Sequence, residues 1–389
     1  MTPAASIRRP LVATLWASYG PYHVARVNAL QRVFNSTVVP ISYAEHDPTY
    51  PFFRETPPGL RILSKGSTAD IHFFAALWAA WSTVRQLKPD LILTPGYERG
   101  ETLGTVLAAK TLGVPIFLML DNQSDDSPRS HSKEWVKSLY LRCFDAFVIA
   151  GPTTAAYLRN LAVPPGRECD GYDCIDNDRV AGLVKQYRTS SPSPHQRPYL
   201  LCIARLIPKK NLTRLLQAYA QYRQQRSAGE PAWDLVLVGD GPESAALRQL
   251  ACEHNVANAV RFAGAEFDYE KIVCWLAFAR GLVLPSHESE QWGLVVNEAL
   301  AAGLPVLVSR QCGCSASLVD DRVNGRLFDG KSVAQIAQAI GWLHDNDGRR
   351  EQLSQRSLLI AKQFTPQRLA EKIHVLYRKI ACKGTASAT

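Results

Sequence analysis

The sequence predicts an α/β protein of two doubly wound domains, each a parallel sheet covered by helices on both faces. The chain of 389 residues is too long for one ordinary core. Short apolar runs rich in β-branched residues recur along it, separated by segments with helical spacing. Strands that are apolar throughout are typical of parallel sheets buried on both faces.

Ten apolar runs are the expected strands. They lie at 11–15, 37–41, 91–94, 115–120 and 146–150 in the first half, and at 199–204, 234–239, 260–264, 281–286 and 305–309 in the second. In such sheets ligands bind beyond the carboxyl ends of the strands. A cleft between two domains that face each other is therefore the expected site.

The two series of runs are separated by RTSSPSPHQRP, residues 188–198, which is rich in Ser and Pro and poor in apolar residues. We expect an N-terminal domain over 1–188, a hinge linker over 189–197 and a C-terminal domain over 198–365. Residues 366–389 are expected to form a helix that packs back on the N-terminal domain, followed by a tail.

The composition narrows the class of protein. Hydrophobic residues make up 46% of the chain and charged residues 20%, which is ordinary for a soluble globular enzyme. The formal net charge is +9, but Lys and Arg form no run of five, so no nucleic-acid partner is expected. Nine scattered cysteines favour reduced thiols. Residues 1–10 lack the apolar core of a signal peptide, so a cytoplasmic location is expected.

One segment leaves open a peripheral contact with an anionic membrane surface. WVKSLYLRCF, residues 135–144, is both basic and apolar, as are many helices that lie on membranes. The more common alternative is a helix that packs on the core while Lys137 and Arg142 extend to solvent.

Arg205 and Lys210 follow the expected strand 199–204 and precede a segment with helical spacing. A helix that starts there, with Asn211 as its N-cap, presents free N–H groups and partial positive charge. Together with the two cations it would make an anion site suited to a diphosphate. The alternative is that both side chains are merely solvated.

Two glutamates, Glu290 and Glu298, flank the start of the expected helix 293–302, which Gly303 ends. A buried carboxylate accepts two hydrogen bonds and suits a vicinal diol such as a ribose. Backbone N–H groups at the helix start are available for a phosphate or a sugar hydroxyl. They belong to Gly293, Leu294 and Val295. Two surface glutamates are the alternative.

Five blocks in the second half carry a family resemblance. They read IARLIPKKN, LVLVGDGPE, VRFAG, VLPSHESEQWGLVVNEALAAGLPVLVS and DDRVNGRLFD, in this order over residues 199–330. Together they resemble the C-terminal half of the family-4 retaining glycosyltransferases with the GT-B fold. The more divergent first half has SYGPYHVAR, residues 18–26, which is similar to the family's glycine-bearing first loop.

The resemblance implies a donor site for a nucleotide-diphosphate sugar. Arg205 and Lys210 would neutralise the diphosphate, Glu298 would hold the ribose, and Glu290 would lie by the donor sugar. The remaining donor-binding positions that it implies are Gly20, Gly239, Phe262, Ala263, Gly293, Leu294 and Val295, with the base near Phe262 and Ala263. Asn211 and Ala204 depart from the family, which often has Gly at both positions.

The acceptor side has weaker signals. Asp121 follows the expected strand 115–120, and His23 lies in the first loop. Both are candidates for the catalytic cleft, together with Glu290, Arg205 and Lys210. For Asp121 and His23 the alternatives are a capping or turn residue and an ordinary loop histidine.

The expected activity is transfer of a hexose from a UDP- or GDP-sugar, with retention and without a metal or other cofactor. The expected acceptor is a hydroxyl of a glycan or lipid-linked saccharide, in polysaccharide or glycoconjugate biosynthesis. A nucleotide-sugar epimerase or phosphorylase of the same fold, and a binding protein without catalysis, remain as alternatives. The triplets at 176–178 and 345–347 match D-x-D metal motifs but fall in turn or helix-end contexts, and Gly239-Asp240-Gly241 lacks the rest of a dinucleotide fingerprint.

Overall fold

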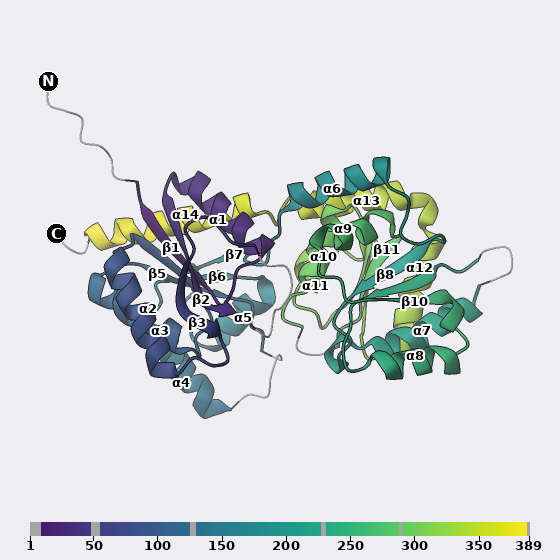
Figure 1. Cartoon of the computed structure of the whole chain (residues 1–389), viewed down its shortest axis with the longest axis horizontal. Coiled ribbons are helices and arrows are strands. Elements are labelled where there is room, and N and C mark those ends of the chain that lie inside the picture. The colour runs from purple at the N-terminus through teal and green to yellow at the C-terminus, as the bar shows by residue number, and fades with distance from the viewer. Residues whose placement is uncertain (1–8, 48–54, 125–129, 227–230, 288–289, 387–389) are drawn as a thin grey trace, which may run out of the picture.

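The computed structural model describes residues 9–47, 55–124, 130–226, 231–287 and 290–386. Two parallel sheets, each flanked by helices, lie side by side (Figure 1). The prediction of two doubly wound α/β domains is thus confirmed. Among the described residues, no helix is both long and apolar enough to cross a membrane.

The first sheet has the strand order β3-β2-β1-β4-β5-β6-β7, with every pair parallel. Its strands are β1 (Leu11–Trp16), β2 (Thr37–His46), β3 (Arg61–Ser67), β4 (Leu91–Pro95), β5 (Ile116–Leu120), β6 (Ala146–Ile149) and β7 (Glu168–Asp170). Its helices are α1 (Pro21–Phe34), α2 (Phe73–Leu87), α3 (Gly100–Leu112), α4 (His131–Leu141) and α5 (Pro152–Asn160).

The second sheet has the order β10-β9-β8-β11-β12-β13, also parallel throughout. Its strands are β8 (Tyr199–Ile203), β9 (Asp234–Val238), β10 (Val260–Gly264), β11 (Gly281–Leu284), β12 (Val306–Ser309) and β13 (Gly325–Phe328). The remaining helices are α6 (Asn177–Ser190), α7 (Leu212–Gln224), α8 (Ser244–Glu253), α9 (Tyr269–Phe278), α10 (Leu294–Ala301), α11 (Ser315–Leu318), α12 (Val333–Asp345), α13 (Arg350–Ala361) and α14 (Pro366–Ala386).

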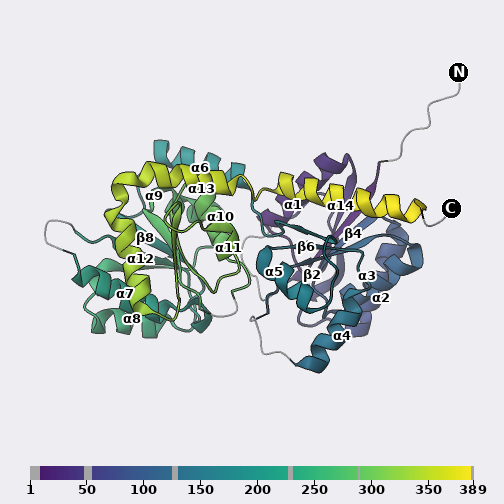
Figure 2. The same cartoon turned by 180° about the vertical axis from the view of Figure 1, so that it is seen from behind.

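The chain passes between the domains at two places. The first lies after β7, where Cys174 packs in the N-terminal core and Ile175 in the C-terminal core. The second precedes α14, whose Leu369, Ile373 and Leu376 complete the core beneath α1. Figure 2 shows α14 running along the N-terminal domain beside α1, as expected for a helix that packs back.

The position of α6 differs from the sequence expectation. The expected N-terminal domain, 1–188, contained most of this helix, but its Val180 and Val184 pack in the core that α9 and α10 share. Both ends of the expected linker, 189–197, therefore join the C-terminal domain, and the segment cannot act as the hinge between domains. His195 also fixes it to the sheet, because its Nε2 lies 2.7 Å from Oδ2 of the buried Asp234.

Two glycines set the close packing of α2 on α3. A Cβ atom at Gly104 would lie 2.1 Å from the carbonyl oxygen of Leu77, and one at Gly100 would lie 2.3 Å from that of Phe73. The obstacle is backbone in both cases, so the helices would have to move apart. We therefore expect Gly104→Ala to lower the free energy of unfolding by about 1–3 kcal/mol. Denaturant titration measures this.

Gly182 in α6 is the matched control for Gly104. A Cβ atom there meets nothing within 4 Å, so Gly182→Ala should raise stability by roughly 0.5–1 kcal/mol through helix propensity alone. Equal effects of the two substitutions would contradict the role of close helix packing.

Candidate active site

A cavity of about 440 Å³ lies between the domains, at the carboxyl ends of β1, β4 and β5. The N-terminal domain supplies most of its wall, and Leu294 comes from the start of α10 in the other domain. The lining residues with polar or charged side chains are Ser18, Tyr19, Tyr22, His23, Arg26, Asp47, Asp121, Tyr172 and Asp173. The position at the strand ends is where the sequence analysis expected a ligand.

A largely buried ion pair lies at the carboxyl edge of the sheet in the C-terminal domain. Lys210 follows β8 and donates to Oε2 of Glu290, which follows β11 and is 7% exposed. Ser286 Oγ donates to the same oxygen at 2.8 Å. Burial alone would raise the pKa of Glu290, but Lys210 and Lys209 hold it below its usual value. The carboxylate is thus ionised and fixed in orientation.

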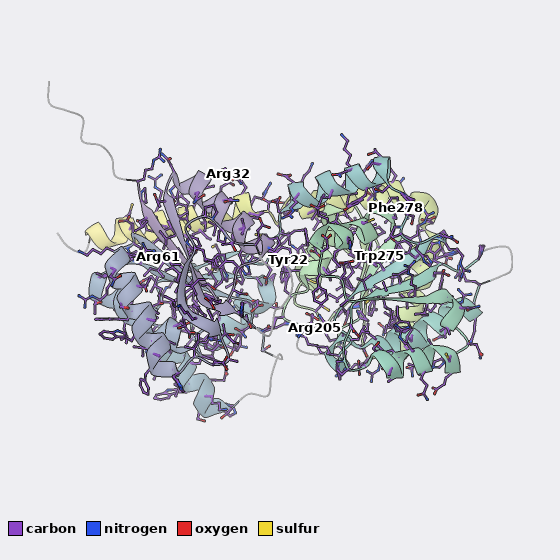
Figure 3. The ribbon with its side chains drawn as sticks, viewed as in Figure 1. Tyr22, Arg32, Arg61, Arg205, Trp275 and Phe278 are labelled. Atoms are coloured by element: carbon purple, nitrogen blue, oxygen red, sulfur yellow. The ribbon has the colours of Figure 1, made fainter. Side chains whose placement is uncertain are left out.

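Arg205 lies at the same edge of the sheet, in the segment that leads from β8 to Lys210, and its side chain is exposed. Figure 3 shows it on the side of the C-terminal domain that faces the N-terminal domain. It has no ion-pair partner among the described residues. Arg205, Lys209 and Lys210 therefore concentrate positive charge at the carboxyl end of β8, with one buried carboxylate to balance it.

Glu298 lies in α10 and is only 4% exposed. Its Oε1 accepts a hydrogen bond of 2.5 Å from the hydroxyl of Tyr22, at the start of α1 in the other domain. Tyr269 of α9 bonds the same carboxyl group. The expected ribose carboxylate is therefore engaged by two tyrosines in this structure, one from each domain. Ribose hydroxyls would have to replace at least one of them.

Next to Glu298, Asn297 ties the domains together. Its Nδ2 donates to the carbonyl oxygen of Asp173 at 3.0 Å, and its Oδ1 accepts from Trp292 Nε1 at 2.8 Å. Gln123 Nε2 makes a third bond between the domains, to the carbonyl oxygen of Glu290 at 2.8 Å. The loop and helix that carry the two glutamates are thus held by the N-terminal domain as well as by their own.

The backbone conformation explains why a glycine, Gly293, stands directly before α10. Its φ of +106° is one that other residues rarely adopt, and a Cβ atom would lie 2.6 Å from Leu284 Cδ2. The helix spans Leu294–Ala301, one residue shorter at each end than the expected 293–302, and Gly303 with φ +74° follows its end. Leu294 and Val295 are half-buried.

Residues 184–358 match the family model described as "Glycosyl transferases group 1". The domain that holds Arg205, Lys210, Glu290 and Glu298 is therefore a group 1 glycosyl transferase domain, and the chain has the GT-B fold.

Relatives of known name support this assignment. A GDP-mannose-dependent alpha-(1-6)-phosphatidylinositol monomannoside mannosyltransferase of Mycobacterium tuberculosis is 30% identical over 46% of this chain and 46% of its own length. A D-inositol 3-phosphate glycosyltransferase of Acidothermus cellulolyticus is 33% identical over 58% of this chain and 49% of its own length. The matched region thus spans about half the length of these curated relatives.

Solved structures show the same fold over nearly the whole chain. Sucrose-phosphate synthase from Thermosynechococcus elongatus superposes with a TM-score of 0.72 at 19% identity, covering 96% of this chain and 100% of the other. The trehalose 6-phosphate synthase from Burkholderia multivorans gives 0.73 at 13% identity, covering 98% and 99%. The two domains of the GT-B fold are therefore both present.

Within the glycosyl transferase domain, Gly239 allows the backbone after β9 to lie close to the backbone after β8. A Cβ atom there would lie 1.9 Å from the carbonyl oxygen of Ala204, and its φ is +140°. Phe262 and Ala263 lie in β10, the edge strand beside it, and both are half-buried. The guanidinium of Arg248 covers the ring of Phe262 at 4.5 Å. These positions line the same strand ends as Arg205, while their contact with a base stays a prediction.

Asn211 occupies the N-cap position of α7 but does not cap it with its side chain. Its φ is +58°, in the left-handed region that Gly and Asn tolerate, which explains why Asn can stand where the GT-B family often has Gly. Its Nδ2 donates to the carbonyl oxygens of Pro285 at 2.9 Å and Gly330 at 2.7 Å. The expected cap bond is thus replaced by two bonds that fix the Lys210 turn.

On the acceptor side, Gly20 and His23 open α1 together. The Gly20 N–H donates to His23 Nδ1 at 3.1 Å. Burial and the nearby Arg26 lower the pKa of His23 to about 3, so the ring is neutral at neutral pH. Because Nδ1 accepts, the proton lies on Nε2. His23 can therefore donate a hydrogen bond to a bound hydroxyl, but in this position it is not poised as a general base.

Asp121 does line the cleft, and sequence reasoning missed the residues around it. Asp173, which is 6% exposed, lies close enough for the negative charge of Asp121 to act on it. Burial and Asp121 raise the pKa of Asp173 to about 8, against the attraction of Arg26 at 3.8 Å. Asp173 Oδ2 has no hydrogen-bond partner among the described residues. Tyr22, Arg26 and Asp173 are thus further candidate site residues.

The D-x-D triplets serve as expected. Asp176 caps α6 by accepting from Arg179 N–H at 3.0 Å, and Asp345 ends α12. No group of three His, Cys, Asp or Glu side chains able to hold a metal ion occurs in the part of the chain that the structure describes.

Stability is expected to depend on pH through Glu298. Burial raises its pKa from 4.5 to about 7, although Tyr22 and Tyr269 oppose the shift. The folded state therefore keeps a proton that the unfolded chain loses, and this contribution to stability disappears as the pH rises through 7. We expect the free energy of unfolding to fall by on the order of 2 kcal/mol from this group between about pH 5 and pH 8.

Denaturant titrations across that range test the role of Glu298. Glu298→Gln cannot ionise, so its unfolding free energy should fall less over the same pH interval. Asp173 acts in the same direction, and Asp173→Asn is the parallel variant. An unchanged pH slope in Glu298→Gln would contradict the raised pKa.

Proposed function

We propose that this chain transfers a hexose from a nucleotide-diphosphate sugar to a hydroxyl of a glycan or lipid-linked saccharide, with retention and without a metal. The observation that supports the proposal is the Lys210–Glu290 pair at the carboxyl edge of the second sheet, on a loop that Gln123 of the N-terminal domain contacts. Fixed cations there would stabilise the negative charge that grows on the leaving diphosphate.

In this proposal each of the two glutamates contacts a different part of the donor. Glu290, ionised and held by Lys210 and Ser286, would accept hydrogen bonds from the donor sugar. Glu298 would accept from the ribose once Tyr22 gives way. Arg205 and the first N–H groups of α10 would contact the phosphates. The acceptor would enter from the N-terminal wall, near His23 Nε2, Asp121 and Asp173.

GDP-mannose is the first donor to test, because relatives that match about half of this chain carry it in their names. UDP-glucose is the second, because structural neighbours were solved as complexes with UDP. The same relatives motivate inositol-containing and lipid-linked acceptors.

The test has two stages, both in EDTA. Nucleotides and nucleotide sugars are first compared by thermal stabilisation, where a ligand at a hundredfold excess over its Kd should add about 2.7 kcal/mol. The selected donor is then incubated with an acceptor panel, and released nucleoside diphosphate and product are measured. Product that keeps the anomeric configuration supports the proposal.

Other outcomes identify the alternatives. Conversion of the donor sugar without any acceptor would indicate an epimerase. Binding with neither transfer nor donor hydrolysis would indicate a binding protein. Activity that EDTA abolishes and a divalent cation restores would overturn the metal-free mechanism.

A further inference from the structure

An exposed aromatic surface lies on the N-terminal domain. Thirteen large apolar side chains are exposed among the described residues, and six of them lie on just two helices, α2 and α4. Phe74 is 80% exposed, Trp78 63% and Trp135 65%. We call the six residues the aromatic face: Phe73, Phe74 and Trp78 on α2, and Trp135, Val136 and Leu139 on α4. Such a concentration marks an interaction surface.

The aromatic face is a consequence of how α2 packs. Ala76, Ala80 and Val84 point into the protein, and the glycines of α3 let the helix lie close on that side. The opposite side carries Phe74, Trp78 and Trp81 at intervals of four and three residues, so they form one stripe. The rings of Trp78 and Trp81 lie 4.8 Å apart. Trp81 packs partly against the core, whereas Phe74 and Trp78 extend away from it.

The two helices border one hollow. A cavity of about 540 Å³ is lined by Phe73 of α2, by Val136 and Tyr140 of α4, and by Tyr97 of the segment between β4 and α3. Pro95, two residues before Tyr97, lines the interdomain cleft. The aromatic face therefore adjoins the same edge of the sheet as the candidate active site. Figure 1 shows α2, α3 and α4 grouped together at the lower left of the N-terminal domain.

Charges around the aromatic face are mainly positive. Arg85 continues the α2 stripe and stacks on Trp81 at 4.7 Å, and α2 contains no acidic residue. On α4, Lys133 is exposed next to the aromatic face, while Glu134 is paired with Lys137. Tryptophan and phenylalanine beside exposed cations suit the interface of an anionic bilayer, where rings enter the headgroup region and cations meet lipid phosphates.

We propose that the aromatic face docks the protein on an anionic membrane surface. Phe74, Trp78 and Trp135 would insert into the headgroup region, with Arg85 and Lys133 against the lipid phosphates. The cleft would then open beside the bilayer, where a lipid-linked acceptor presents its saccharide. The position of the cleft beside a lipid-linked acceptor rests on the proposed function, whereas the docking itself does not. Within residues 135–144, Leu141 and Phe144 pack in the N-terminal core, while Trp135, Val136 and Leu139 are exposed, so the segment presents both a core side and an apolar outer side.

Vesicle flotation with the full chain tests the docking. Vesicles of phosphatidylcholine with phosphatidylglycerol are compared with vesicles of phosphatidylcholine alone. The wild-type protein should float with the vesicles that contain phosphatidylglycerol. The triple variant Phe74→Ser, Trp78→Ser, Trp135→Ser should bind these vesicles at least about tenfold more weakly. Arg85→Gln with Lys133→Gln should weaken binding to the anionic vesicles by about fivefold for each cation.

Phe267→Ser is the matched control, because Phe267 is 62% exposed but lies in the C-terminal domain. It should float as the wild type does, and all variants should keep the wild-type Tm. Wild-type protein that does not float, or a triple variant that floats equally well, overturns the proposal. Wild-type protein that is dimeric by light scattering, with a monomeric triple variant and no flotation, would assign the aromatic face to self-association instead. None of these readouts requires sugar transfer.

Discussion

Replacing Lys210 by alanine is expected to lower kcat for sugar transfer about a hundredfold to a thousandfold. The Lys210 ammonium is only partly exposed, is fixed by Glu290, and lies at the strand edge where the diphosphate is proposed to leave. A cation already in place stabilises the developing charge without reorganisation. The measurement is release of nucleoside diphosphate at saturating donor and acceptor.

Two further variants separate catalysis from folding. Lys210→Ala leaves Glu290 buried with a weakened counter-charge, which by itself destabilises the fold. Lys210→Met combined with Glu290→Gln keeps a neutral pair of similar size, so it should restore Tm but not kcat. Lys209→Ala removes a nearby cation that makes no hydrogen bond to Glu290 among the described contacts, and it should have a smaller effect. A folded Lys210→Ala enzyme within a few-fold of wild-type kcat would show that the diphosphate binds elsewhere.

Glu298→Ala is expected to weaken donor binding roughly 10- to 150-fold. A hydrogen bond to a charged group contributes about 1.5–3 kcal/mol, and the ribose would lose its acceptor. Titration calorimetry with the nucleotide diphosphate alone measures this without turnover. Donor binding as tight as that of the wild type would contradict the ribose assignment.

Tyr22→Phe is the matched variant for that experiment. Tyr22 donates to Glu298 in the unliganded protein, so a ribose must compete with it. Removing the competing hydroxyl should leave donor affinity unchanged or raise it by about two- to tenfold, the equivalent of one neutral hydrogen bond. A large loss of affinity in Tyr22→Phe would mean that Tyr22 itself contacts the donor.

The strands could be predicted where burial makes them apolar on both faces. β1, β5 and β9 are buried along almost their whole length, and their sequences are continuous apolar runs. β3, β7 and β13 were missed because they are edge strands that are partly exposed, so polar residues interrupt them. The domain boundary failed for a related reason. α6 is polar overall, and only the tertiary structure shows that Val180 and Val184 reach the C-terminal core.

The candidate site was predictable where its residues follow strand ends in a recurrent order. Lys210 and Glu290, 80 residues apart, were both named as donor-site residues from the resemblance, and the structure shows them in contact, while their roles stay predictions. No sequence pattern pointed to Tyr22 or Asp173 as site residues. Tyr22 reaches Glu298 across 276 positions of sequence, and the chemistry of Asp173 arises from burial and from Asp121. Contacts of this kind depend on how two domains lie against each other, which no local pattern encodes.

The packing of α14 also has a consequence for the order in which the protein forms. The first 170 residues supply all seven strands of the N-terminal sheet, yet Leu369, Ala370, Ile373 and Leu376 close one face of its core. During synthesis this sheet therefore keeps an uncovered apolar face until α14 has left the ribosome. The domain that begins first is completed last, and a chain cut short before residue 366 would leave that face open to chaperones and to aggregation.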